Sequence, residues 1–240
     1  GLYVRLVDGS WFGYDFSALY SSEETAMYDI EIDDNGYKWI AMPKDNDIIV
    51  YDDRGTIKDI SDDRSIRLTR TEGLGSIPGA RGIKIEKDQD GLIWIGTSDG
   101  IAVHYNPSQV FNGDINFDRV IFFDGENNEI VLQNSIVTEI AIDGFNRKWI
   151  GTENSGVILL SADGKETILE FNIDNSPLLS NSISAITIDD ETGEVYIATA
   201  KGLVSYRGEA VTGSENLSNV SIYPNPVRPE YSGNIAISGL

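Results

Sequence analysis

The chain contains no cysteine and only one histidine, His104, among its 240 residues. Disulfide bridges, thiolate metal sites and cysteine nucleophiles are therefore excluded, and histidine clusters cannot bind a metal. Basic residues are also few: 18 lysines and arginines stand against 39 aspartates and glutamates, for a formal charge of −21. With no basic stretch, the sequence argues against binding to nucleic-acid phosphates or to an anionic membrane surface.

Long apolar runs are absent too, and none approaches the ~18–20 residues of a membrane-spanning helix. What is abundant is glycine, with 24 residues, and hydrophobic side chains, which make up 40% of the chain. Glycine together with frequent aspartate and asparagine favours tight turns, and the hydrophobic share is sufficient for a sizeable core. Since no segment has a sustained apolar period of about 3.6 residues, we expect an all-β protein with very little helix.

An internal repeat organises the chain. Its anchors are aromatic residues about 50 residues apart, namely Trp39, Trp94, Trp149 and Tyr196. An aspartate stands six residues before each anchor, at Asp33, Asp88, Asp143 and Asp190. Glycine or asparagine follows that aspartate in every copy, as Gly91 does in the second. Aligned without gaps, the copies also share Ile30, Ile85 and Ile140, and Thr187 is the mismatch in the last copy.

Each copy predicts a set of short antiparallel strands. Alternating segments such as 29–32 indicate a half-buried strand, the Asp-Gly turn reverses the chain, and the aromatic anchor begins the return strand. Glycine-led apolar runs give a third strand at 100–105, 156–160 and 202–206. A fourth strand is predicted near Ser65–Arg70, Asp118–Phe123 and Glu166–Phe171. Four antiparallel strands in a repeat of about 40–50 residues are typical of a β-propeller blade.

The phase of the repeat predicts a partial ring. Three whole blades are expected at 24–75, 79–125 and 134–173, with the first three strands of another at 181–207. The segment from Leu2 to Tyr14 resembles the last two strands of a preceding blade. The end pieces could close a small ring, or the chain could be part of a larger propeller. We favour the larger propeller, because four-bladed rings are uncommon and the strand at 202–206 would duplicate the one at 2–6.

A change of composition follows the blades. Residues 208–219 are rich in glycine, serine and glutamate, which predicts a linker. Residues 220–240 contain three prolines and a strand-like segment at 235–237. We expect this region to be the beginning of a C-terminal β-sandwich.

The segment 85–101 reads Ile-x-x-Asp-x-x-Gly-x-x-Trp-Ile-Gly-Thr-x-x-Gly-Ile, and 140–157 repeats it with one additional residue. This pattern resembles the two-component regulator propeller repeat, and the resemblance covers about residues 1–207. In the Bacteroidetes the repeat implies either an oligosaccharide-sensing propeller of a hybrid two-component system or a surface propeller of the type IX (Por) secretion system. The Tyr-Pro-Asn-Pro segment within 219–240 resembles the start of a type IX sorting-type domain, which favours the secretion protein.

No residue set in the sequence indicates catalysis. The recurring tryptophans are interpreted as core side chains between blades, because each blade must bury a face on its neighbour. The turn aspartates around Asp88 resemble a Ca²⁺ loop, but Thr97 stands where a bidentate glutamate is needed, so we predict no metal site. His104 is predicted to be a half-exposed strand residue. We therefore expect no enzyme activity and no cofactor.

Binding is expected at the longer connectors between strands, which are 52–64, 69–81 and 126–134, because such loops vary most on a propeller. The candidate binding residues Arg64, Arg67, Arg70 and Arg81 lie in or next to these connectors and are the most basic part of an acidic chain. A solvated strand edge guarded by charge is the alternative interpretation.

The sequence therefore predicts a non-catalytic recognition or scaffold propeller of a secreted, periplasmic or outer-membrane-surface protein in the type IX attachment complex. A periplasmic oligosaccharide sensor is the alternative. The expected partners are other secretion proteins or an anionic glycan such as lipopolysaccharide. Open blade edges would also permit self-association.

Overall fold

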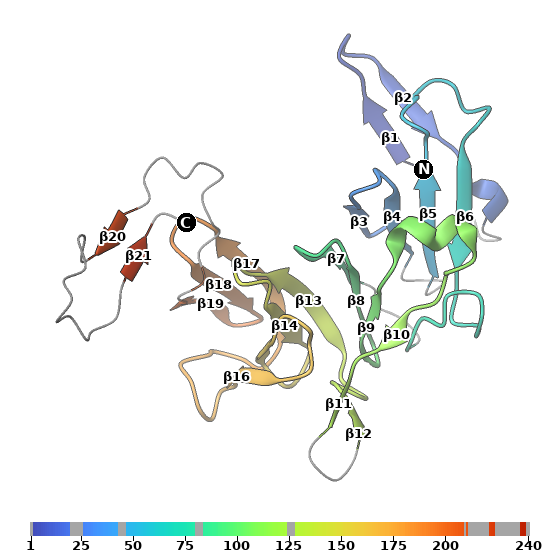
Figure 1. Cartoon of the computed structure of the whole chain (residues 1–240). Helices are drawn as coiled ribbons and strands as arrows, with labels where there is room; N and C mark the ends of the chain where they lie inside the picture. Colours follow the sequence, from blue (N-terminus) through green and yellow to red (C-terminus); the bar gives the residue numbers. More distant parts are fainter. Residues whose placement is uncertain are drawn as a thin grey trace, which may run out of the picture.

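The computed structural model describes residues 2–19, 26–42, 47–79, 84–123, 128–208, 210, 221–223 and 236–238. Within these residues the regular structure is β-sheet apart from two 3₁₀ helices, η1 (Ser17–Leu19) and η2 (Pro107–Asn112). The predicted all-β class, with four-stranded antiparallel blades in an open arrangement, is confirmed (Figure 1). Among the described strands, no sheet closes on itself.

Three sheets have four strands each, in simple sequential order. Blade 1 contains β3 (Asp29–Ile32), β4 (Lys38–Met42), β5 (Asp47–Asp52) and β6 (Arg64–Leu68). Blade 2 contains β7 (Lys84–Lys87), β8 (Ile93–Thr97), β9 (Gly100–His104) and β10 (Asp118–Arg119). Blade 3 contains β13 (Val137–Ile142), β14 (Lys148–Thr152), β15 (Val157–Leu160) and β16 (Thr167–Phe171). A three-stranded blade 4 follows, with β17 (Ile183–Asp189), β18 (Glu194–Thr199) and β19 (Gly202–Arg207).

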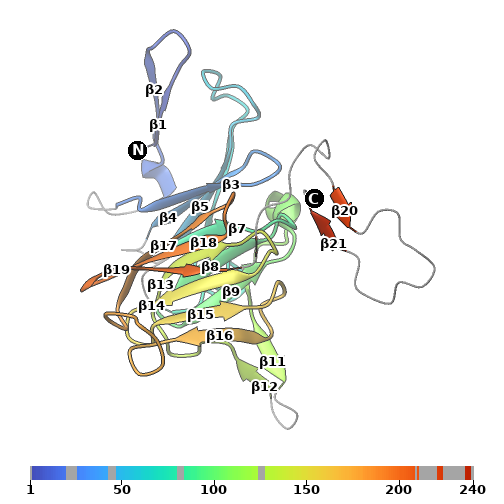
Figure 2. The same cartoon turned by 90° about the vertical axis from the view of Figure 1, so that its left-hand side faces the viewer.

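Three hairpins accompany the blades. The first joins β1 (Leu2–Arg5) to β2 (Trp11–Tyr14), and its inner face packs against blade 1. The second joins β11 (Ile121–Phe123) to β12 (Asn128–Ile130) and projects away from blades 2 and 3 (Figures 1 and 2). The third pairs β20 (Ser221–Tyr223) with β21 (Ala236–Ser238). The linker at 208–219 lies largely outside the described residues, and the division into domains stays a prediction.

The first strands of the blades lie side by side, with β7 next to β3, β13 next to β7, and β17 next to β13 (Figure 2). The faces of adjacent blades enclose separate apolar clusters. Trp39 packs between blades 1 and 2, Trp94 between blades 2 and 3, and Trp149 between blades 3 and 4. All three indoles are at most 1% exposed, so they are core side chains and offer no surface for sugar stacking.

Each tryptophan is tied to the turn aspartate that precedes it. In blade 1, Asp33 Oδ1 accepts the backbone N–H groups of Asn35 and Tyr37, and its Oδ2 accepts Trp39 Nε1–H at 3.0 Å. The same three-bond pattern joins Asp88 to Trp94 at 2.8 Å and Asp143 to Trp149 at 3.2 Å. Gly91 supplies the positive φ of 77° that this turn requires. The aspartate therefore caps the turn and also satisfies the buried indole N–H.

The last copy departs from the gapless alignment. Thr187 lies opposite Tyr196, whereas Glu31 lies opposite Trp39, so the turn of blade 4 contains one additional residue. As a result Asp189, not the expected Asp190, caps the turn by accepting the N–H groups of Glu191 and Thr192. The insertion also explains the mismatch at Thr187, because the position equivalent to Ile30 belongs to Ile186.

Two further expectations were wrong. The fourth strand predicted at Asp118–Phe123 is divided: β10 pairs with β9 for two residues, and after Val120 the chain enters the β11–β12 hairpin. His104 is fully buried rather than half-exposed. Its ring contacts Trp39 and Phe117 edge-on. Because the Asn106 N–H donates to Nδ1, the Nε2–H donates to Asp114 O at 2.9 Å, which fixes a neutral tautomer.

Candidate functional site

The three long connectors predicted to carry binding each line a pocket. Residues 52–62 line pocket 1 with 35–38, and residues 70–79 line pocket 2 with 98–99 and 116–119. Residues 129–132 line pocket 3 with 164–167. Because adjacent strands are antiparallel, the loops of pocket 1 and the 70–79 connector of pocket 2 lie at opposite rims of the propeller.

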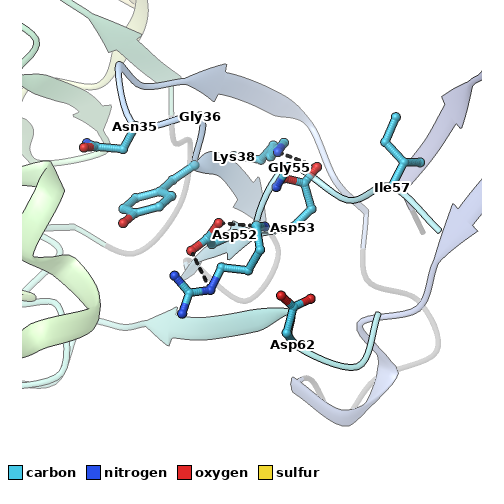
Figure 3. A pocket seen from close by; sticks show the side chains of 10 residues that line it. Asn35, Gly36, Lys38, Asp52, Asp53, Gly55, Ile57 and Asp62 are labelled. Carbon is cyan, nitrogen blue, oxygen red and sulfur yellow. Dashed lines mark hydrogen bonds and ion pairs between the residues drawn. The ribbon is translucent and has the colours of Figure 1, made fainter. Parts of the chain in front are cut away.

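Pocket 1 has a volume of about 780 Å³, but within the described ranges all of its charged groups except Asp62 are bound to other charged groups (Figure 3). Lys38 Nζ lies 2.7 Å from Asp53 Oδ2. Asp52 accepts two bonds from Arg64 at 2.9 Å and the backbone N–H of Arg54. These bonds order the connector, and they leave few groups for recognition of a ligand.

Pocket 2 has a volume of about 910 Å³, and not all of its polar side chains are paired with one another. Arg70 is exposed, and its guanidinium has no hydrogen-bond or ion-pair partner within the described part of the chain. Asn116 Oδ1 accepts Gly75 N–H and Ser76 Oγ–H, which holds that amide in a fixed orientation. The pocket therefore combines the Arg70 guanidinium with the oriented Asn116 amide, and the carboxylates of Glu72 and Asp118 also belong to its lining. A cation and an amide of this kind can bind a hydroxyl-rich ligand that carries an anionic group.

Arg119 forms the opposite wall of pocket 2. Its Nη1 donates to Asp99 O at 3.1 Å, and its Nη2 pairs with the Asp99 carboxylate. This pairing lowers the pKa of Asp99, first through the hydrogen bond from Arg119. Arg119 was not singled out from the sequence, because its place in the pocket depends on the break after β10.

The predicted arginine cluster is not assembled as one basic patch. Arg64 pairs with Asp52 and stacks over Phe111, 4.4 Å from its ring centre. Arg67 pairs with Asp47 and donates to Leu19 O at 2.8 Å. Arg81 lies outside the described residues. Of the arginines that the structure describes in this set, Arg70 is thus the one that lines a pocket and has no carboxylate partner within the described ranges.

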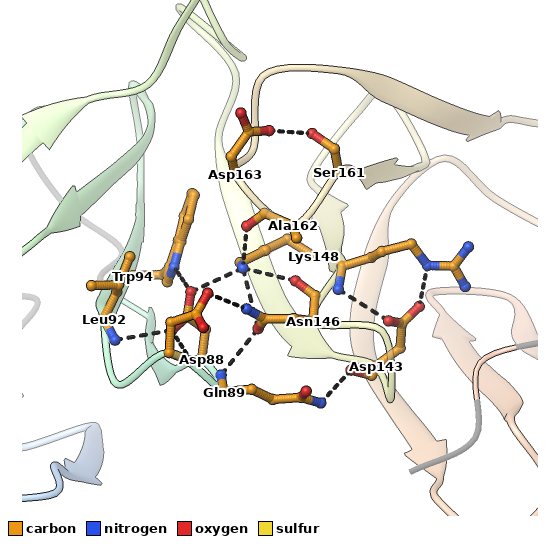
Figure 4. Close-up of polar contacts among 12 residues, drawn as sticks. Asp88, Gln89, Leu92, Trp94, Asp143, Asn146, Lys148, Ser161, Ala162 and Asp163 are labelled. Carbon is orange, nitrogen blue, oxygen red and sulfur yellow. Dashed lines mark hydrogen bonds and ion pairs between the residues drawn. The ribbon is translucent and has the colours of Figure 1, made fainter. Parts of the chain in front are cut away.

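A second polar constellation lies between blades 2 and 3 (Figure 4). Lys148 Nζ donates to Asp88 Oδ2 at 2.9 Å and to the carbonyls of Asn146 and Ala162. Gln89 Nε2 donates to Asp143 O at 2.9 Å across the same interface. Since Lys148 and the Asp88 side chain are 0% exposed, this network joins two blades and does not present a ligand site.

A third polar site is a cluster of charged residues on the first strands of blades 1, 2 and 3. Lys84 Nζ is 3.2 Å from Asp29 Oδ2 and 3.1 Å from Glu139 Oε1. Glu86 lies on the same strand as Lys84. Burial, reinforced by the charges of Glu31, Asp29 and Glu139, raises the pKa of Glu86 to about 7. Among the described residues, no group of three His, Asp or Glu side chains is arranged to hold a metal ion.

With the fold and pockets defined, the chain was compared with known proteins. No family model and no curated protein sequence matches it. Among solved structures it matches PorZ, described as an essential surface component of the type IX secretion system of Porphyromonas gingivalis. Sequence identity is 30%, the TM-score is 0.75, and the match covers 97% of this chain and 32% of the PorZ chain. The chain is a β-propeller segment similar to PorZ.

Extracellular sensor-type domains match at lower similarity than PorZ. One, described as part of a one-component system of B. thetaiotaomicron, has 17% identity, a TM-score of 0.56, and coverage of 85% of this chain and 29% of its own. Another, from a protein described as a hybrid two-component system of the same organism, has 21% identity, a TM-score of 0.54, and coverage of 78% and 22%. These matches show the fold alone.

The resemblance predicted from the repeat, to PorZ and to extracellular domains of two-component systems, is therefore confirmed. The chain spans about a third of the length of PorZ. No helix among the described residues is long and apolar enough to cross a membrane.

Proposed function

We propose that this chain is the propeller part of a PorZ-like protein at the bacterial surface, where it serves type IX secretion as a recognition scaffold. The observation that carries the proposal is the 30% identity to PorZ over 97% of the chain. The sensor domains reach only 17% and 21% over a smaller part of it. The proposal includes a compartment outside the cytoplasm, because PorZ is described as a component of the bacterial surface.

Pocket 2 is the proposed recognition site, and its proposed ligand is an anionic glycan. Arg70 has no carboxylate partner among the described residues, so we propose that it binds a carboxylate or phosphate on a sugar. The surrounding side chains Ser76 and Asn116 supply hydroxyl and amide groups of the kind that bind sugar hydroxyls. Lipopolysaccharide, which carries such groups at the cell surface, is the ligand we expect.

A chimera tests the secretion function. The matching segment of P. gingivalis PorZ is replaced by this chain in cells that lack their own PorZ, and surface display of proteins carrying type IX sorting domains is measured. We expect the chimera to restore display. The matched control carries the equivalent segment of the B. thetaiotaomicron two-component domain, which should not restore it. Equal results for the two chimeras would overturn the proposal.

Calorimetry tests the ligand. The protein is titrated with lipopolysaccharide polysaccharide freed of its lipid and with neutral oligosaccharides. Arg70→Gln should weaken binding of the anionic polysaccharide by about tenfold, the size of a lost charge-assisted contact. Arg207→Gln, which removes the same charge from exposed β19, should leave binding unchanged. Tight binding of a neutral oligosaccharide that is insensitive to Arg70 would favour the periplasmic sensor.

A further inference from the structure

Pocket 3 is a groove with an apolar floor and does not belong to the proposed glycan site. It has a volume of about 590 Å³ and lies between the β11–β12 hairpin and blade 3. Ile158 and Leu160 of β15 form its floor, and Phe122 and Ile130 of the hairpin line its other side. Figures 1 and 2 both show the hairpin projecting next to blade 3.

The groove exists because the fourth strand of blade 2 is cut short. In blade 1, β6 pairs with β5 over five residues, whereas β10 pairs with β9 over two. The chain then turns away into the hairpin, so the face of β16 next to the groove is left partly uncovered, whereas Ile158 and Leu160 of β15 stay buried. Ile168 of β16 is accordingly 43% exposed, and Ile121 of β11 is 47% exposed. On the opposite face of β16, Leu169 and Phe171 pack into the core with blade 4.

The outer strand of blade 3 is also poorly protected against added strands. Charged residues on edge strands hinder pairing with another chain. The outer strand β6 carries two arginines and β10 is Asp-Arg, but β16 reads Thr-Ile-Leu-Glu-Phe, with one charge. At its far end Asn175 Nδ2 donates to Glu170 O at 3.0 Å, so pairing would run along 167–169.

The charges around the groove are mainly negative. Glu129 stands on the hairpin side and Glu166 on the blade side, and both belong to the lining. Glu170 follows on β16, opposite Ile158. The one lysine of the lining, Lys165, lies 3.7 Å from Asp163, which offsets its charge. Charge complementarity therefore selects a basic partner.

We propose that this groove binds an extended segment of a partner protein, in which an aliphatic side chain packs beside exposed Ile168 of β16, next to the groove, and flanking lysines or arginines face Glu129 and Glu166. Such a segment would lie along β16 as an added strand, a recognition mode in which backbone hydrogen bonds give affinity and side-chain pockets give specificity. The proposal concerns a different surface from pocket 2 and stands whether or not the glycan binds.

Synthetic peptides test this. A fluorescently labelled seven-residue peptide of alternating lysine and valine is compared with its glutamate–valine counterpart by fluorescence anisotropy at physiological salt, with the whole chain as the receptor. The lysine peptide should bind and the glutamate peptide should not. The double variant Glu129→Gln/Glu166→Gln should weaken binding about fivefold or more, as expected for two partly solvated ion pairs. Ile168→Ser should also weaken binding, because it removes apolar contact from the groove.

The matched control is Glu153→Gln/Glu191→Gln, which makes the same charge change at two exposed positions outside the groove. It should leave the affinity unchanged. Equal losses in the control and groove variants would mean that the peptide responds only to the net charge of −21, and would overturn the proposal. No binding of the lysine peptide would overturn it as well. Hydrogen exchange gives a second readout, since bound peptide should protect amides of 167–169 and not those of β6.

Discussion

Lys148 and Asp88 form an ion pair of 2.9 Å across the interface between blades 2 and 3, with both side chains completely buried. Asp88 Oδ2 also accepts Trp94 Nε1–H, and the ammonium group lies 4.7 Å from the centre of the Trp94 ring. One carboxylate thus ends a turn of blade 2, orients its core tryptophan and neutralises a lysine of blade 3. Burial lowers the pKa of Lys148, and the hydrogen bond that its ammonium group donates to Asp88 opposes that effect.

Breaking this pair should be costly. Asp88→Asn leaves a buried ammonium without its counter-ion, and we expect a loss of about 3 kcal/mol of stability. Asp88→Asn/Lys148→Met removes both charges and should lose less than Asp88→Asn alone. Urea unfolding followed by tryptophan fluorescence measures these values. Lys38→Met is the matched control, because Lys38 occupies the equivalent strand position but is partly exposed in its pair with Asp53. A double variant less stable than the single one would contradict this account.

The turn aspartates provide a test of the corrected alignment. Asp33→Ala removes two backbone caps and leaves the buried Trp39 N–H unpaired, so we expect a loss of about 2 kcal/mol. Asp189→Ala removes only turn caps, and its effect should be smaller but measurable. Asp190→Ala should have no effect on the urea midpoint. If Asp190→Ala destabilised the protein and Asp189→Ala did not, the gapless alignment would be right and the register of β17 with β18 wrong.

The blades were predictable because each repeats a local requirement. A tight turn needs a capping carboxylate and a glycine, and a tryptophan at a fixed distance can share that carboxylate, so Asp88, Gly91 and Trp94 recur as a visible pattern. The one-residue insertion in the turn of blade 4 could not be seen in the sequence, because positions 189 and 190 are both aspartate.

Long-range pairings were not visible in the sequence. Arg64 and Arg67 look like a basic stretch in the sequence. Strand pairing places Arg64 opposite its ion-pair partner Asp52, and it places Arg67 opposite Ile49, two residues from its ion-pair partner Asp47. The ion pair between Arg119 and Asp99 in pocket 2 was also not visible in the sequence, because the two residues are 20 positions apart. The break in the fourth strand at Val120 was missed because the apolar pattern continues through 121–123, whose partner strand β12 belongs to the hairpin.

Glu86 should make the protein less stable as the pH rises toward neutrality. Its pKa in the fold is about 7, above the usual value of 4.5, so the folded state binds more protons than the unfolded state between these values. The stabilisation is fully present below pH 4.5 and is lost as the pH rises through 7. Glu86→Gln should remove this part of the pH dependence, and the variant should be more stable than the parent protein at pH 8. Urea midpoints across the pH range test this, with exposed Glu153→Gln as the control. Equal pH profiles for the parent and Glu86→Gln would show that Glu86 ionises normally.

His104 should make the protein less stable as the pH falls, which is the opposite of the effect of Glu86. Burial lowers the pKa of its ring, although the bond to Asp114 O opposes that change. The unfolded chain therefore takes up a proton near pH 6.5 while the folded ring stays neutral, and stability falls as the pH drops from 7 toward the lowered folded pKa. His104→Gln should remove this loss. Long-range ¹⁵N NMR of the ring provides the direct measurement: Nε2 should carry the proton, Nδ1 should have the shift of an unprotonated nitrogen, and neither should change as the pH falls through 6.5, the ordinary pKa of histidine. A ring that titrates near pH 6.5 would mean that His104 is solvated, as the sequence alone suggested.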